Sequence, residues 1–166
     1  MEWADRVSDL VVEEVVRVPW IKGAKAFLDK YSSKLPVFVI SGTPETELKY
    51  VVDQRKMSYY FKEVLGSPVK KPAHIRRLLA KYRLTPERCV FIGDALTDYN
   101  AALEAGLYFI VIQGEVRFPD TVTPLPDCRG IERALKTFAR HFDPKCSGCY
   151  LIQKQYNPRR LLQRQP

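Results

Sequence analysis

Three short polar segments follow apolar runs and carry side chains suited to phosphate chemistry. The segment Ser41–Thr43 offers hydroxyls and backbone N–H groups just before a predicted helix, an arrangement that favours phosphate. Lys71 precedes Pro72 at another predicted helix start, where its ammonium could balance developing negative charge. Asp94 and Asp98 follow a third apolar run, and carboxylate oxygens suit Mg²⁺. Together these segments indicate a phosphate-handling site.

Each of these features also has an ordinary structural explanation. A serine after a strand often forms a turn. Lys70 and Lys71 could be a solvated pair at a helix entry, and Asp98 could cap a helix that begins at Tyr99. Taken singly, none of the features identifies a site. Their order along the chain, and the sheet edge that we expect them to share, favour one.

The residues around these segments alternate between strand and helix patterns. Apolar, β-branched runs predict strands at 37–40, 64–65, 89–92 and 108–112. A helix is expected after Ser41, with Thr43 as its cap and Pro44 as its first residue. Apolar residues at helical spacing predict further helices at 10–18, 22–31, 73–82, 99–105 and 131–142. This alternation predicts a three-layer α/β fold, in which helices cover both faces of a parallel sheet. The polar segments would share the carboxyl edge of that sheet, where such folds bind ligands.

The composition is that of an ordinary globular protein with a basic end. Of the 166 residues, 46% are hydrophobic and 28% charged, and no apolar run reaches the roughly 18 residues of a membrane span. The first residues show no signal-like block, so we expect a cytoplasmic protein without membrane association. The net charge is +8, and from Lys145 onward there are cations but no carboxylate side chain. We interpret this end as a solvated tail, with contacts to phosphates or acidic partners as the alternative.

The four cysteines predict neither a structural zinc site nor a disulfide framework. Cys146 and Cys149 form a single C-x-x-C pair, whereas structural zinc sites need four ligands. Zinc binding or redox chemistry by this pair is a minor alternative to a simple loop. Cys89 falls within an apolar strand pattern, so we expect it to be a buried, inert thiol.

The polar segments resemble three motifs of the haloacid dehalogenase (HAD) superfamily, in its phosphoglycolate-phosphatase-like branch. The run 37–44 is similar to motif two, Lys71-Pro72 to motif three, with Lys70 as the alternative lysine, and the run 91–106 to motif four. The resemblance covers roughly residues 19–112. It implies a Rossmann-like core that hydrolyses phosphomonoesters through an aspartyl-phosphate with Mg²⁺. The substrate of a complete enzyme would be a small phosphorylated metabolite.

The resemblance also implies roles for individual residues. Ser41 and Gly42 would bind the phosphoryl oxygens, and Lys71 would neutralise them. Asp94 would ligate Mg²⁺, and Asp98 would ligate it or orient its water. The family's first motif, an Asp-x-Asp nucleophile motif on an apolar strand, occurs nowhere in the chain. Loss of a covalent nucleophile can cost on the order of 10⁶ in rate. We therefore expect weak or absent Mg²⁺ binding and no hydrolysis by this chain alone.

The absent motif would also remove the strand that lies between the strands of motifs two and four in the family's sheet. We interpret residues 1–18 as the remnant of a helical cap, 19–143 as an incomplete HAD-like core and 144–166 as the basic tail. The gap could close by direct pairing, by self-association through the exposed sheet edges, or by a local segment such as Tyr150–Ile152. A fragment whose missing part is encoded upstream is favoured over a genuine degenerate protein.

Three functions stay open at this stage. The first is a HAD-type, Mg²⁺-dependent phosphomonoester phosphatase that lacks its first motif here. The second is a non-catalytic module, derived from such a phosphatase, that binds a phosphorylated ligand or a protein. Nucleic-acid binding by the tail ranks last, because the tail offers only Tyr150 and Tyr156 as aromatic platforms for bases.

Overall fold

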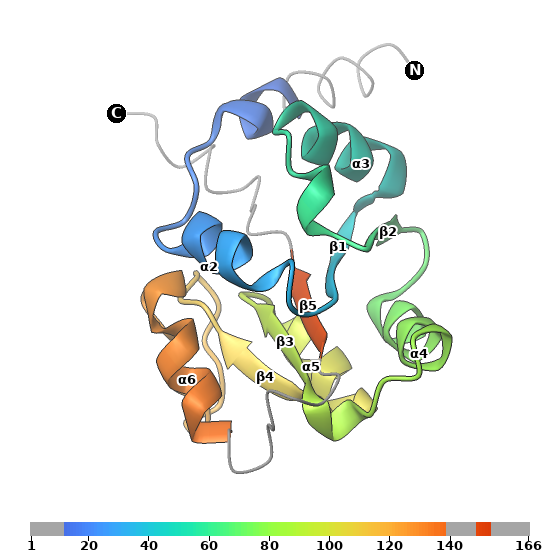
Figure 1. Cartoon of the computed structure of the whole chain (residues 1–166). Helices are drawn as coiled ribbons and strands as arrows, with labels where there is room; N and C mark the ends of the chain where they lie inside the picture. Colours follow the sequence, from blue (N-terminus) through green and yellow to red (C-terminus); the bar gives the residue numbers. More distant parts are fainter. Residues whose placement is uncertain (1–11, 139–148, 154–166) are drawn as a thin grey trace.

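Five parallel strands form the sheet at the centre of the molecule (Figure 1). The computed structural model describes residues 12–138 and 149–153. The strand order is β2-β1-β5-β3-β4, and every pair of neighbours is parallel. The predicted parallel α/β architecture is therefore confirmed. The strands are β1 (Val37–Pro44), β2 (Glu63–Ser67), β3 (Cys89–Gly93), β4 (Tyr108–Val111) and β5 (Cys149–Gln153).

Helices cover both faces of this sheet, as the apolar strands require. The α-helices are α2 (Ala24–Tyr31), α3 (Glu45–Gln54), α4 (Lys71–Lys81), α5 (Leu96–Ala105) and α6 (Ile131–Phe138). Short 3₁₀ helices lie at η1 (Ser58–Tyr60), η2 (Pro86–Arg88) and η3 (Cys128–Gly130). Residues 12–17 are also helical. None of the helices in the described ranges is long and apolar enough to cross a membrane.

Alternate side chains of β1 point into two separate apolar layers. Phe38 and Ile40 join the cluster that contains the buried residues of α4 and α5. Val37 packs with the buried residues of α2 and α6, and Val39 packs with α3. All four side chains are buried, because helices remove both faces of the strand from water. This packing holds the carboxyl end of β1, with Ser41, at the sheet edge.

The last described strand, β5, lies in the middle of the sheet. Residues 37–40 of β1 pair with residues 150–153, and residues 89–92 of β3 pair with residues 149–152. The gap expected between β1 and β3 is thus closed by the local segment, one of the three alternatives considered above. The interpretation of this end as a solvated tail is wrong for residues 149–153. Self-association stays a prediction.

Several predicted helix boundaries differ from the structure. Helix α5 begins at Leu96, three residues before the predicted start at Tyr99. Helix α3 begins at Glu45, so Pro44 occupies the cap position that Thr43 was expected to take. The predicted N-terminal and C-terminal helices are present at 12–17 and 131–138. Val18 is a bend rather than the last helical residue, and the other remaining predicted residues (10–11 and 139–142) lie outside the described ranges.

One cysteine prediction is wrong in part. Cys89 is fully buried, as expected, but it is disulfide-bonded rather than an inert thiol. Cys128 is buried and free. Cys146 and the side chain of Cys149 lie outside the described part of the chain, so the zinc or redox alternative stays a prediction.

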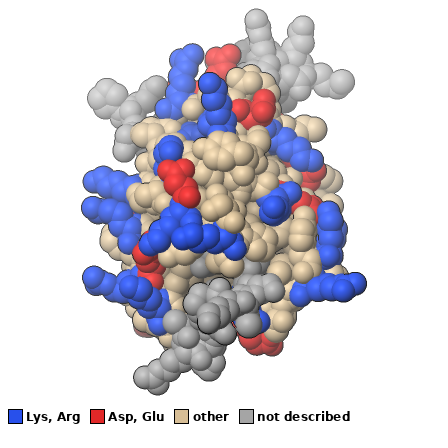
Figure 2. Space-filling view, in the orientation of Figure 1, with Lys and Arg blue, Asp and Glu red and all other residues tan. Residues whose placement is uncertain are grey.

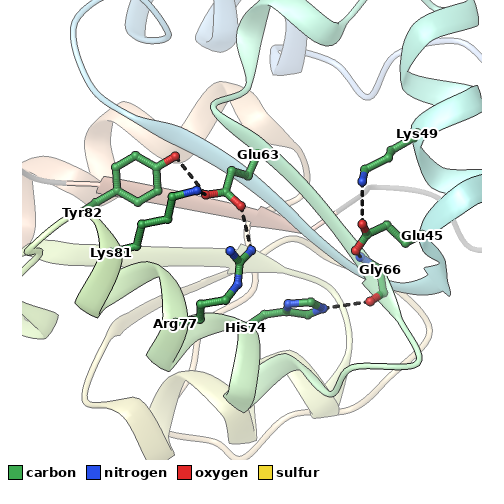
Figure 3. Close-up of polar contacts among 8 residues, drawn as sticks. All are labelled: Glu45, Lys49, Glu63, Gly66, His74, Arg77, Lys81 and Tyr82. Carbon is green, nitrogen blue, oxygen red and sulfur yellow. Dashed lines mark hydrogen bonds and ion pairs between the residues drawn. The ribbon is translucent and has the colours of Figure 1, made fainter.

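Side chains from α3 and α4 bond to both backbone polar groups of Gly66 in β2. The Gly66 N–H donates to Oε2 of Glu45 at 3.2 Å, and the Gly66 carbonyl oxygen lies 2.8 Å from Nε2 of His74 (Figure 3). A Cβ atom at position 66 would lie 2.5 Å from Cα of Glu45 and 2.5 Å from the carbonyl oxygen of Thr43. The approach of the α3 start to β2 therefore requires glycine at position 66.

The substitution Gly66→Ala should destabilise the fold by about 2–3 kcal/mol, because its methyl group would meet backbone atoms that cannot move independently. The matched control is Gly42→Ala, since a Cβ atom at Gly42 would meet nothing within 4 Å. Urea denaturation of the two variants measures the difference. Equal losses of stability would contradict the close approach of α3 to β2.

Candidate functional site

The docking of α4 against β2 determines where Lys71 lies. The Glu63 carboxylate on β2 accepts hydrogen bonds from Arg77 at 2.7 Å, Lys81 at 2.6 Å and Tyr82 at 2.9 Å (Figure 3). Burial tends to raise the pKa of Glu63, but these three hydrogen bonds outweigh it and lower the pKa to about 2. Glu63 therefore stays ionised and holds α4 in place, with Lys71 at the start of the helix.

Lys71 and Asp98 form an ion pair that is almost sealed from solvent. Lys71 Nζ lies 2.6 Å from Oδ1 of Asp98 and also donates to Oγ1 of Thr97 at 3.0 Å. The side chain of Lys71 is 12% exposed and that of Asp98 is 0% exposed. The structure thus brings together two of the predicted site residues, which lie on α4 and α5.

Asp98 also serves the start of its own helix. Its Oδ2 accepts the backbone N–H of Ala95 at 3.1 Å, so Asp98 does take part in capping, although not of a helix that begins at Tyr99. The capping position is the third residue of α5 rather than the one before the helix. A Cβ atom at Gly93 would lie 2.7 Å from Oδ2 of Asp98, so the glycine makes room for this carboxylate. Both carboxylate oxygens are therefore engaged by the protein.

Burial makes Asp98 a weak acid for its type. Desolvation is the largest influence and raises its pKa from the ordinary 3.8. The Lys71 ammonium and the Ala95 N–H partly offset this, whereas the charge of Asp94 raises the pKa further, to about 6. Asp94 and Asp98 are thus close enough for their charges to interact. A second anion near this pair would be repelled unless positive charge accompanied it.

Ser41 and Thr43 form a local turn at the end of β1. Ser41 Oγ donates to Oγ1 of Thr43 at 3.1 Å and accepts the Thr43 N–H at 3.1 Å. Ser41 is buried, and Gly42 is exposed beside it. The carboxyl ends of β1 and β3 are two strand spacings apart, about 10 Å, because β5 lies between them. Ser41 therefore shares the sheet edge with Asp94 but stands across β5 from it.

Two residues near the predicted site were not singled out from the sequence. Thr97, the second partner of Lys71, lies inside the Gly93–Asp98 run, and its hydroxyl was the available signal. Gly114 follows the last predicted strand, and a Cβ atom there would lie 3.4 Å from Cβ of Asp94. No local pattern marks Gly114, since its closeness to Asp94 depends on the loop after β4.

The described residues do not form a complete Mg²⁺ site. Mg²⁺ requires near-octahedral coordination by oxygen. No cluster of three or more His, Cys, Asp or Glu side chains suited to a metal occurs within the described ranges. Both oxygens of Asp98 already have partners in Lys71 and Ala95. The ligand roles of Asp94 and Asp98 stay predictions.

The basic residues from Lys145 to Arg164 lie outside the described part of the chain. On the face shown in Figure 2, Lys and Arg side chains are spread widely and Asp and Glu side chains lie among them. Positive charge is therefore not gathered into one stripe on this face, as a nucleic-acid groove would require. Nucleic-acid binding by the tail stays the lowest-ranked prediction.

The pKa of Asp98 predicts a specific pH dependence of stability. Between pH 3.8 and about 6 the folded protein binds more protons than the unfolded chain. Protonation of Asp98 therefore adds about 3 kcal/mol to the free energy of unfolding below pH 3.8, and this contribution is lost as the pH rises through about 6. The variant Asp98→Asn should lack this fall, whereas the exposed control Asp120→Asn should keep it. Urea denaturation at several pH values between 4 and 7 measures both, and identical profiles for the two variants would contradict the assignment.

Comparison with known protein families gives a match over most of the region that carries these residues. The model of the haloacid dehalogenase-like hydrolase family, a hydrolase family, matches residues 7–106. The chain is 30% identical over 100 residues to a "Probable phosphoglycolate phosphatase" of Pseudomonas putida, covering 57% of this chain and 39% of the relative. It is 28% identical over 86 residues to the phosphoglycolate phosphatase of Vibrio cholerae, covering 49% and 38%. The chain thus spans about two fifths of these relatives.

Solved structures show a similar fold. A haloacid dehalogenase-like hydrolase from Xanthomonas campestris superposes with a TM-score of 0.62 at 22% identity, covering 76% of this chain and 59% of the other. A HAD-superfamily hydrolase from Geobacter sulfurreducens gives a TM-score of 0.61 at 20% identity, covering 74% and 64%. At these identities the similarity concerns the fold alone. It agrees with the three-layer fold described above, in which helices cover both faces of a parallel sheet.

Proposed function

The chain belongs to the haloacid dehalogenase-like hydrolase family, and from this premise we propose that it binds phosphate weakly at the Ser41–Lys71 edge but does not hydrolyse phosphomonoesters by itself. Hydrolysis of a small phosphorylated metabolite is our proposal for a protein that also contains the first motif. The observation that carries the proposal is the composition of β5. The strand beside both β1 and β3 has the sequence Cys-Tyr-Leu-Ile-Gln, without a carboxylate.

Ser41 is not arranged as a nucleophile. Ser41 bonds to Thr43 through both its hydroxyl hydrogen and its oxygen, and no base accepts its proton. A serine hydroxyl needs an adjacent base before it can attack phosphorus. From Lys145 to the end of the chain there is no Asp or Glu either. The phosphoryl group would therefore be bound without being transferred covalently to the protein.

The charges at the edge support weak rather than strong phosphate binding. Lys71 supplies one positive charge, and Asp98 is already within 2.6 Å of it. Asp94 adds a second carboxylate close enough to influence Asp98. A phosphate dianion would gain the Lys71 ammonium and the backbone N–H groups of the Ser41 turn, but it would meet repulsion from the carboxylates. We therefore expect binding in the millimolar range.

The first test is hydrolysis of p-nitrophenyl phosphate in the presence of Mg²⁺. We expect no turnover above buffer, because loss of a covalent nucleophile costs on the order of 10⁶ in rate. The paired variant is Asp94→Asn, which distinguishes hydrolysis at this edge of the sheet from hydrolysis by a contaminating phosphatase. Turnover by the wild-type chain that disappears in Asp94→Asn would contradict the proposal.

The second test is stabilisation by inorganic phosphate. Millimolar phosphate should raise the melting temperature of the wild-type chain by a few degrees, because a ligand that binds only the folded state stabilises it. Lys71→Ala should abolish the shift, whereas Lys70→Ala, which removes the exposed neighbouring cation, should keep it. Sulfate at the same ionic strength controls for a general salt effect. Loss of the shift in Lys70→Ala instead would assign the motif-three role to the alternative lysine.

A further inference from the structure

A partly enclosed apolar cavity of about 90 Å³ lies between the helices α2 and α3 and the sheet. Its wall includes Trp20, Phe27, Val39, Val51 and Ile92. None of the residues at the phosphate edge (Ser41, Lys71, Asp94 and Asp98) is among the described residues that line it. The cavity is therefore separate from the site discussed above and needs its own explanation.

Among the described residues of this lining the charged one is Arg55, the residue at the end of α3. Arg55 Nη1 donates to the carbonyl oxygens of Val15 at 2.9 Å and Val18 at 2.6 Å. The centre of its guanidinium lies 5.3 Å from the centroid of the Trp20 ring. These contacts fix the guanidinium at the cavity and use one of its three nitrogens for hydrogen bonds.

Arg55 has no carboxylate partner among the described residues. Each described ion pair of an arginine joins another residue, such as Arg77 with Glu63 or Arg129 with Asp127. Burial alone lowers the pKa of Arg55, without an opposing contribution from an anion. A partly desolvated cation without a counter-ion is costly. Nε and Nη2 of Arg55 also keep donors to which an anion could bind in a forked geometry.

The size of the cavity limits the ligand. An apolar cavity of about 150 Å³ holds benzene, which has six heavy atoms, so a cavity of about 90 Å³ suits a hydrocarbon body of roughly four. Its lining is otherwise apolar or weakly polar, which favours a hydrocarbon body over a sugar or a nucleotide. Arg55 adds a requirement for one anionic group.

We propose that this cavity binds a small monocarboxylic acid, with its hydrocarbon body against Trp20, Phe27 and Val51 and its carboxylate at Arg55. The ligand would fill apolar space and supply a counter-ion that the described residues do not provide to the guanidinium. It would do so without contact with the phosphate edge, so the proposal holds whether or not the chain binds phosphate.

Pentanoate, whose hydrocarbon body has four carbons, is the probe, and pentanamide and acetate are its controls. Isothermal titration calorimetry with the full chain should show pentanoate binding at least about tenfold tighter than pentanamide, because the amide cannot form the charge-assisted bonds. Acetate, which has a single methyl group as its hydrocarbon body, should bind more weakly than pentanoate. Equal affinities for pentanoate and pentanamide, or no binding of pentanoate at millimolar concentration, would overturn the proposal.

Three variants locate the binding. Arg55→Gln keeps donors for the Val15 and Val18 carbonyls but removes the charge, so it should lose the preference for pentanoate over pentanamide. Arg17→Gln removes an exposed cation nearby and should leave that preference unchanged. Ala24→Leu adds volume to the cavity lining and should abolish binding of both ligands. If Arg55→Gln does not fold, Ala24→Leu still decides, since undiminished pentanoate binding in that variant would place the ligand elsewhere.

Discussion

The pairing of β5 with both β1 and β3 is the constraint on which the sheet depends. β1 and β3 make no direct pair, so the two halves of the sheet are joined by backbone hydrogen bonds through β5. Each buried N–H and C=O group along the facing edges of β1 and β3 would otherwise lack a partner, at a cost comparable to a lost hydrogen bond. The position of every residue at the carboxyl edge follows from this arrangement, because β5 sets the separation of Ser41 from Asp94.

Within that edge, the ion pair of Lys71 and Asp98 combines a structural and a chemical role. Asp98 starts α5 through the Ala95 N–H and holds Lys71 through its other oxygen. Removal of either partner would leave a charge almost fully buried, which explains how the geometry can persist in a chain without the nucleophile motif. A ligand that needs the Lys71 ammonium has to compete with Asp98 for it. The ion pair of Lys71 and Asp98 therefore keeps the geometry of the site and at the same time limits the affinity of the site for an anion.

Local sequence patterns were sufficient for much of this fold. The apolar runs at 37–40 and 89–92 are strands, and the spacing of Ile75 and Leu78 marks a helix. Asp94 follows a strand as predicted, whereas Ser41–Thr43 belongs to the last part of β1. The remainder depends on contacts between distant residues. No property of residues 149–153 indicates which strands they join, and Tyr150–Ile152 was only one of three ways to close the gap. The disulfide of Cys89 and the pairing of Lys71 with Asp98 are likewise set by tertiary neighbours rather than by spacing.

The central position of β5 has a consequence for how the chain acquires its structure. Val37 pairs with Tyr150, a separation of 113 residues, although the two strands lie side by side in the finished sheet. A contact of such high sequence separation forms slowly, since a long loop must close before the pairing stabilises it. During synthesis on a ribosome, β1 to β4 emerge well before their central strand. Until residues 149–153 have been synthesised, the inner edges of β1 and β3 can pair with other chains. The yield of folded protein would therefore depend on chaperones or on a low concentration of nascent chains.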